Sequence, residues 1–230
     1  MHTLTVTKQR IRAKALLIDL DGTIVDIAEP CLEAAEQAAS KLGLRNIDAK
    51  IGLTIAKTLQ SSHSIDEAFQ KLSADKKVSK DFVKAFLDSW YALAPTRTCL
   101  LPKVASTLKI VSKRWALALI TRRNMPKEPI RKELQRLGLT PFFKVIITSQ
   151  DVDEPKPSPQ AYVKAANQLG VSIRNCAVVG DSTVDIQAGK SAGAKTIAVL
   201  SGLFSRYELE KLEPDLILRD LSVLPDFLET

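Results

Sequence analysis

Two carboxylates separated by one residue follow an apolar run near the start of the chain, in Asp19-Leu-Asp21-Gly22-Thr23. Because side chains alternate along a strand, Asp19 and Asp21 are expected to emerge on the same side of its tip. Paired carboxylates favour a hard cation such as Mg²⁺. One carboxylate can attack phosphorus while the other transfers protons, and Gly22 permits a sharp turn. Alone, the motif is equally compatible with an ordinary acidic turn.

A second acidic motif, Gly180-Asp181-Ser-Thr-Val-Asp185, follows another apolar run. Asp185 falls at the expected start of a helix, where the helix dipole stabilises an acid. That role explains Asp185 but not Asp181, which stands where the strand tip meets the loop. We therefore expect this second acidic strand end to supply the remaining oxygen ligands of the cation.

A lysine and a threonine complete a set of residues suited to phosphate. Lys156 stands between Pro155 and Pro157, which restrict its backbone, so its ammonium group is expected to point at the nucleophile and the phosphoryl group. Thr121 directly follows an apolar run, and a hydroxyl with the N–H groups of a helix N-terminus can hold phosphate. Taken singly, a loop lysine is usually solvated and a threonine at a strand end is usually structural.

The elements that must position these residues are indicated by continuous apolar runs. The runs predict strands at residues 15–19, 115–120, 144–147, 176–180, 195–199 and 215–218. Continuous rather than alternating apolar residues are typical of strands covered on both faces. Helices are expected between them from about residue 100 onward, which predicts an α/β fold with a doubly wound, Rossmann-like parallel sheet.

The segment from about residue 27 to 93 has no convincing strand. Apolar residues recur there every three or four positions, as in Ile51, Ile55 and Leu59, which predicts four short amphipathic helices. An insertion after a strand's carboxyl end stands over the crevice where open α/β sheets bind ligands. We therefore predict a core of residues 1–25 and 96–230 and an all-helical cap of residues 26–95. At the N-terminus, Leu4 and Val6 alternate with threonine, as in an edge strand or a loose tail.

Composition excludes several classes of protein. With 45% hydrophobic residues in 230, the chain is globular, and no apolar run approaches the roughly 20 residues that a membrane helix needs. The net charge of +7 is scattered, and 5% aromatic residues are not interleaved with basic ones, so no nucleic-acid partner is expected. Two histidines and three separated cysteines leave little for a zinc site or a Ser/His/Asp triad. The N-terminus lacks a signal-peptide pattern, which favours the cytoplasm.

Taken together, the four motifs resemble the haloacid dehalogenase superfamily in type, order and position at predicted strand ends. The resemblance covers nearly the whole chain, and the place of the helical insert is similar to that of a C1 cap. In layout the chain is most similar to the phosphoglycolate-phosphatase-like branch. The resemblance implies a Mg²⁺-dependent phosphatase that hydrolyses a small phosphorylated metabolite, a phosphate monoester, through an aspartyl-phosphate.

The same resemblance implies roles for individual residues. Asp19 would be the nucleophile and Asp21 the general acid and base, while Thr121 and Lys156 would hold the phosphoryl group. The segment from Gly22 to Asp26 matches the flap that links core to cap, with hinges near Asp26 and Pro95. The metal ligands would be Asp19, the backbone carbonyl of Asp21, Asp181 and Asp185, the last either directly or through water.

One position departs from the family pattern. Relatives usually have asparagine after the motif threonine, whereas Arg122 and Arg123 follow here. Arg122 either strengthens anion binding through its bidentate fork or points into solvent. The expected substrate-binding residues are Thr121, Arg122, Lys156, Gly22 and Thr23.

Alternatives remain open at this stage. Relatives that cleave carbon–halogen bonds usually lack the second aspartate, so Asp21 favours phosphate esters. A phosphomutase keeps both aspartates, and a catalytically idle member could bind a phosphorylated ligand or a partner. The sequence does not decide between monomer and homodimer.

Overall fold

The computed structural model describes residues 10–76 and 78–230, so the N-terminal segment with Leu4 and Val6 lies outside the described residues. Its centre is a six-stranded sheet in which every neighbouring pair is parallel, in the order β6-β5-β2-β7-β8-β9. The strands are β2 (Ala15–Asp19), β5 (Ala116–Ile120), β6 (Val145–Ile147), β7 (Cys176–Gly180), β8 (Lys195–Val199) and β9 (Leu216–Leu218). The predicted parallel sheet and its six strands are confirmed.

Helices cover both faces of the sheet, as continuous apolar strands require. Leu16 and Ile18 of β2 face one hydrophobic cluster, and Ala15 and Leu17 face another; all four are fully buried. The first cluster includes α5 (Val104–Val111), α6 (Lys127–Arg136) and the 3-10 helix η4 (Leu221–Phe227). The second includes α7 (Gln160–Leu169) and α8 (Thr183–Ala192). The order β6-β5-β2-β7-β8-β9 with both faces covered is the doubly wound arrangement.

Shorter elements complete the core. The strand β1 (Ile11–Arg12) pairs in parallel with β10 (Leu228–Glu229), which brings the two described ends of the chain together. The helix α9 (Arg206–Glu210) follows β8. The remaining 3-10 turns are η1 (Thr140–Phe142), η2 (Ser149–Asp151) and η3 (Ile173–Asn175).

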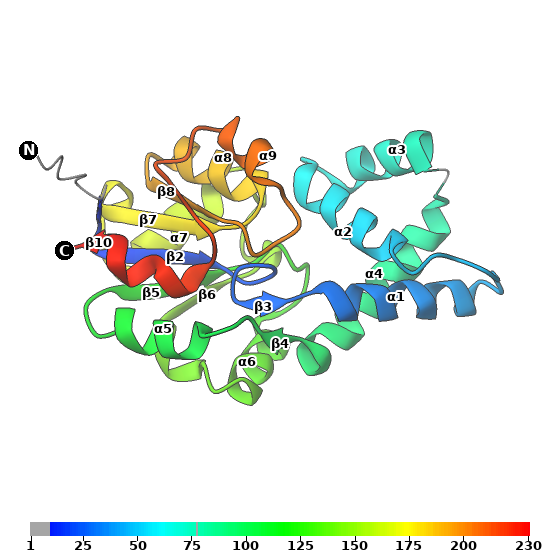
Figure 1. Cartoon of the computed structure of the whole chain (residues 1–230), viewed down its shortest axis with the longest axis horizontal. Helices are drawn as coiled ribbons and strands as arrows, with labels where there is room; N and C mark the ends of the chain where they lie inside the picture. Colours follow the sequence, from blue (N-terminus) through cyan, green and yellow to red (C-terminus); the bar gives the residue numbers. More distant parts are fainter. Residues whose placement is uncertain (1–9, 77) are drawn as a thin grey trace, which may run out of the picture.

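Four helices, called the cap helices below, stand between β3 (Val25–Asp26) and β4 (Cys99–Leu100), which pair with each other antiparallel. They are α1 (Ala28–Lys41), α2 (Ile51–Ser61), α3 (Ile65–Lys76) and α4 (Lys80–Arg97). The cap helices gather at one end of the molecule, beyond the carboxyl ends of the strands (Figure 1). The division at residues 26 and 95 stays a prediction; Pro95 lies inside α4, near its end.

Within residues 10–76 and 78–230, no helix combines the length and the apolar character needed to cross a membrane.

Candidate active site

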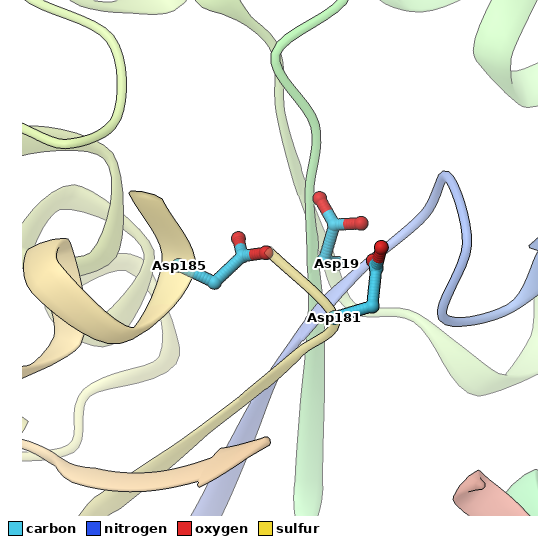
Figure 2. A group of neighbouring side chains, drawn as sticks. All are labelled: Asp19, Asp181 and Asp185. Carbon is cyan, nitrogen blue, oxygen red and sulfur yellow. The ribbon is translucent and has the colours of Figure 1, made fainter. Parts of the chain in front are cut away.

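The acidic motifs meet at the carboxyl edge of the sheet. Asp19 ends β2, Thr121 follows β5 and Asp181 follows β7, and these three strands are neighbours. Asp185 enters from the first turn of α8. Figure 2 shows the side chains of Asp19, Asp181 and Asp185 reaching into one space, and one carboxylate oxygen of each lies within 4.8 Å of the others. The structure therefore brings together the side chains of Asp19, Asp181 and Asp185, three of the four predicted metal ligands, and the role of the Asp21 carbonyl stays a prediction.

Lys156 joins the nucleophile to the second acidic motif. Its Nζ donates to Oδ1 of Asp19 at 2.5 Å and to Oδ1 of Asp185 at 2.6 Å, and its side chain is only 2% exposed. Burial alone would lower the pKa of Lys156, but Asp185 and Asp19 raise that pKa above its usual value. These two contacts hold the ammonium group between the carboxylates of Asp19 and Asp185.

Asp185 has hydrogen-bond partners on both oxygens. Its Oδ1 accepts from Lys156 and from the hydroxyl of Tyr162, and its Oδ2 accepts from the backbone N–H and the hydroxyl of Ser182. The bonds to Ser182 form a capping box at the start of α8. Burial favours a higher pKa for Asp185, but the charge of Lys156 and the hydrogen bonds from Lys156, Ser182 and Tyr162 together lower that pKa. The ionised form of Asp185 is therefore favoured, and this carboxylate both caps the start of α8 and forms an ion pair with Lys156.

Asp181 is the least satisfied member of the group. Its Oδ1 accepts from the Thr23 hydroxyl at 2.9 Å, while its buried Oδ2 has no hydrogen-bond partner among the described residues. A Cβ atom at Gly22 or Gly202 would lie 2.5 Å or 1.7 Å from that oxygen. Burial, reinforced by Asp19, raises the pKa of Asp181 well above its usual value. An unpartnered buried carboxylate oxygen between two obligatory glycines fits a metal ligand.

Asp19 is paired with Lys156, yet its pKa is raised like that of Asp181. Burial raises the pKa of Asp19 to about 7, more than the ion pair with Lys156 lowers it. A divalent cation favours the ionised form of the carboxylates beside it. Two neighbouring carboxylates with raised pKa values therefore suit such a cation. The donor set consists of oxygen atoms, which suits a hard cation.

Asp21 belongs to a separate buried ion-pair cluster. Arg123 donates from Nε to Oδ2 of Asp21 at 2.9 Å and from Nη2 to Oδ1 at 2.5 Å, a bidentate pair. Its Nη1 donates to Glu133 at 2.5 Å. The side chains of Arg123 and Glu133 are 2% and 0% exposed. Burial opposes the charge on Arg123, but Asp21 and Glu133 raise its pKa above the usual value.

This cluster extends to the end of the cap helices. The hydroxyl of Thr98, the residue after α4, donates to Glu133 at 2.5 Å. Arg136 donates to the carbonyl of Thr98 at 2.8 Å. The ring of Trp90, in α4, lies 5.5 Å from the guanidinium carbon of Arg123. The orientation of Asp21 is therefore linked to the junction between α4 and the core.

Arg122 reaches across to the cap instead of into solvent. Its Nη1 donates to the carbonyl of Leu59 at 2.7 Å and to that of Ser62 at 3.1 Å, at the carboxyl end of α2. A cation at this end of a helix complements the helix dipole and satisfies free carbonyls. Arg122 thus ties the loop after β5 to the cap, and a direct contact with substrate stays a prediction.

The remaining predicted substrate-binding residues have protein partners as well. The Thr23 hydroxyl is fully buried on Asp181, and the carbonyl of Gly22 accepts from the Ser201 hydroxyl at 2.7 Å. Thr121 lies 3.5 Å from Asp21, hydroxyl to Oδ2. Thr23 and Gly22 therefore support the metal side of the site through Asp181.

Sequence reasoning missed Arg123 as a partner of Asp21, and it missed Glu133 and Gly202 entirely. Glu133 had a usable signal, because it lies between Ile130 and Leu134 on the apolar face of α6, where an acid needs a buried partner. Gly202 had none, since its close approach to Asp181 depends on how the loop after β8 folds back over β7.

Comparisons with known proteins give similarities in both sequence and fold. A family model described as haloacid dehalogenase-like hydrolase matches residues 16–199. The phosphoglycolate phosphatase of Aquifex aeolicus is 31% identical over 195 residues, which cover 82% of this chain and 85% of that protein. The phosphoglycolate phosphatase of Salmonella typhimurium is 30% identical, covering 91% of this chain and 89% of its own. A solved haloacid dehalogenase-like hydrolase from Streptococcus pneumoniae shares the fold, with a TM-score of 0.74 at 22% identity over 94% of this chain and 98% of that one.

Proposed function

The chain belongs to the haloacid dehalogenase-like hydrolases, as an enzyme of the phosphatase type, and from this premise we propose that it hydrolyses small phosphate monoesters through a phosphorylated Asp19 with Mg²⁺ as cofactor. One observation carries the proposal. Asp19 and Asp181 lie side by side with raised pKa values, Lys156 holds the first, and an oxygen of the second is buried without a partner. This arrangement fits a nucleophile beside a cation site better than a structural ion pair.

The first step forms a bond between a carboxylate oxygen of Asp19 and phosphorus and breaks the bond from phosphorus to the ester oxygen. Asp21 donates a proton to the departing oxygen, and Lys156 stabilises charge on the transferring group. In the second step Asp21 takes a proton from water, whose oxygen attacks phosphorus. The bond from Asp19 to phosphorus breaks, and inorganic phosphate is released.

The residues that would hold Mg²⁺ are Asp19, Oδ2 of Asp181 and the backbone carbonyl of Asp21. Both oxygens of Asp185 already accept hydrogen bonds, so we assign it a contact through water and a role in holding Lys156. When bound, the cation supplies positive charge to the phosphoryl oxygens and keeps the neighbouring carboxylates ionised.

The experiment that tests this function is phosphate release from a panel of monoesters that includes 2-phosphoglycolate, the substrate in the names of the relatives. Wild type and Asp19→Asn are assayed with Mg²⁺ and with EDTA. Turnover that requires both Mg²⁺ and Asp19 supports the proposal. Folded protein that binds Mg²⁺ and releases no phosphate from any ester would contradict it, and would favour a mutase or a catalytically idle binder.

A further inference from the structure

A cavity of about 320 Å³ lies between the cap helices and the loop that follows β5. Asp21, Arg122 and Arg123 line its core side, and residues of α2 and α4 line its cap side. Because Asp21 is proposed to protonate the leaving oxygen, the leaving group of a bound ester has to lie on this side of the phosphoryl group. The cavity is therefore where the rest of the substrate is recognised.

The cap side of this cavity is mainly apolar. Its lining includes Ile27, Ala56, Leu59, Phe86, Leu87 and Trp90. Among the described lining residues from the cap, the one that can carry a positive charge is His63, whose side chain is 72% exposed and bonded to Glu67. The cap therefore offers no buried cation to an anionic leaving group.

The two arginines on the core side are already engaged. Arg123 directs its Nε, Nη1 and Nη2 groups to Asp21 and Glu133. Arg122 gives its Nη1 to two backbone carbonyls at the end of α2. A carboxylate on the leaving group would have to share Arg122 with these two carbonyls, and the described lining holds no cation reserved for it.

Gln60 contributes a polar, uncharged side chain to the lining of the cavity. Its Oε1 is buried and has no hydrogen-bond partner among the described residues. The amide carries no charge, so Gln60 does not supply the cation that a carboxylate on the leaving group would need.

The size of the cavity also favours a larger, apolar leaving group. One water molecule occupies roughly 30 Å³ in the liquid, so the space has room for about ten waters. A two-carbon leaving group such as glycolate would leave much of it as water against apolar walls. A larger apolar group would displace that water, which is favourable.

We propose that this enzyme selects esters whose leaving alcohol is uncharged and largely apolar, such as an arylalkyl alcohol, over carboxylate-bearing alcohols such as glycolate. The inference rests on the proposed phosphatase function and deepens it by naming the class of leaving group. The bonds made and broken are those given above, with the apolar alcohol as the group that leaves.

The test compares kcat/KM for three esters of primary alcohols: benzyl phosphate, ethyl phosphate and 2-phosphoglycolate. Ethyl phosphate matches phosphoglycolate in chain length but lacks the carboxylate, and benzyl phosphate adds an apolar ring. We expect benzyl phosphate to exceed each of the others by about tenfold or more. A value for phosphoglycolate equal to or above that for benzyl phosphate overturns the inference and leaves the phosphatase function in place.

Two variants of lining residues and one control variant, all in the cap helices, sharpen the comparison. Ala56→Phe fills the cavity from α2 and should lower kcat/KM for benzyl phosphate about tenfold while sparing ethyl phosphate. Ala92→Phe, at an exposed position of α4, is the matched control and should change neither. Leu87→Lys places a cation in the lining and should shift the preference toward phosphoglycolate. Equal losses with benzyl and ethyl phosphate in Ala56→Phe would count against the assignment.

A binding experiment decides the question without turnover. Trp90 lines the cavity, so its fluorescence should respond to benzylphosphonate, which has no ester bond to cleave, and Trp90→Phe should remove the response. Tighter binding of benzylphosphonate than of phosphonoacetate is the expected result. The reverse order overturns the inference. If no ester turns over, the proposed function fails while this titration still decides the inference.

Discussion

Two buried ion-pair clusters hold the two aspartates of the first motif, and they are built alike. Lys156 bridges Asp19 and Asp185, and Arg123 bridges Asp21 and Glu133. In each cluster a cation that is almost fully buried is shared between one aspartate of the first motif and a second acid from a following helix. Since a single buried charge is costly, each second acid keeps its cation ionised and in place.

The clusters differ in how far they extend. The Lys156 cluster lies among strand ends and the first turn of α8, all parts of the core. The Arg123 cluster continues through Glu133 to Thr98 and touches Trp90, so it ends at the cap. Asp19, the proposed nucleophile, is therefore held by the core alone, whereas Asp21, the proposed acid–base residue, is held by a network that the cap shares.

The largest expected effect is on the nucleophile side. Asp19→Asn removes the attacking oxygen charge and should lower kcat by roughly 10⁴-fold or more. Steady-state phosphate release measures it, with Asp153→Asn, an exposed carboxylate outside the site, as the control. A loss of only a few-fold would show that Asp19 is not the nucleophile.

Metal binding tests the proposed cation site, which includes the unpartnered oxygen of Asp181. Mg²⁺ at about 100 times its dissociation constant should stabilise the protein by ~2.7 kcal/mol, because it binds only the folded site. For a chain of this size that is a rise in Tm of about 5–10 °C. Differential scanning fluorimetry with Mg²⁺, against NaCl at the same ionic strength, measures it.

The matched variant for this effect is Asp181→Asn. It removes the charge at the unpartnered oxygen, so most of the Mg²⁺-dependent rise in Tm should disappear. An unchanged rise in this variant would place the cation elsewhere.

The acid–base side is tested by Arg123→Lys. A lysine keeps the charge but cannot bind Asp21 through two parallel N–H groups, so kcat should fall about tenfold with KM little changed. Arg131→Lys, at an exposed position of α6, is the control. Wild-type kcat in a folded Arg123→Lys protein would mean that the bidentate contact has no role in orienting Asp21.

The smallest effect is expected from an exposed ion pair between cap and core. Lys57 lies 2.8 Å from Glu208, and the two side chains are 37% and 36% exposed. Lys57→Met should cost about 0.2–1 kcal/mol in urea unfolding, because water screens such pairs. Lys84→Met, on an exposed part of α4, sets the baseline. A cost of several kcal/mol would erase the contrast with the buried clusters.

The Lys156 cluster was predictable from sequence and the Arg123 cluster was not, for a physical reason. Asp19 ends one apolar run, and the motif with Asp181 and Asp185 follows another, while two prolines flank Lys156. The carboxyl ends of neighbouring parallel strands meet at one edge. Local patterns therefore predict the fold and this half of the site. Arg123 meets Glu133 only because α6 docks with that face inward, and Arg122 meets α2 only because the cap lies where it does. Such contacts depend on packing between elements, which spacing along the chain does not encode.

The most direct measurement of the central claim is a single-turnover reaction with a phosphate ester, quenched in acid and followed by mass spectrometry of the digested protein. We expect one phosphoryl group on the peptide that contains Asp19, and we expect it to form only with Mg²⁺. This label should disappear as phosphate is released and should be absent from Asp19→Asn. Two results would contradict a phosphorylated Asp19. In the first, the wild type releases phosphate while another residue carries the label; in the second, it releases phosphate and no residue is labelled under conditions that trap acyl phosphates.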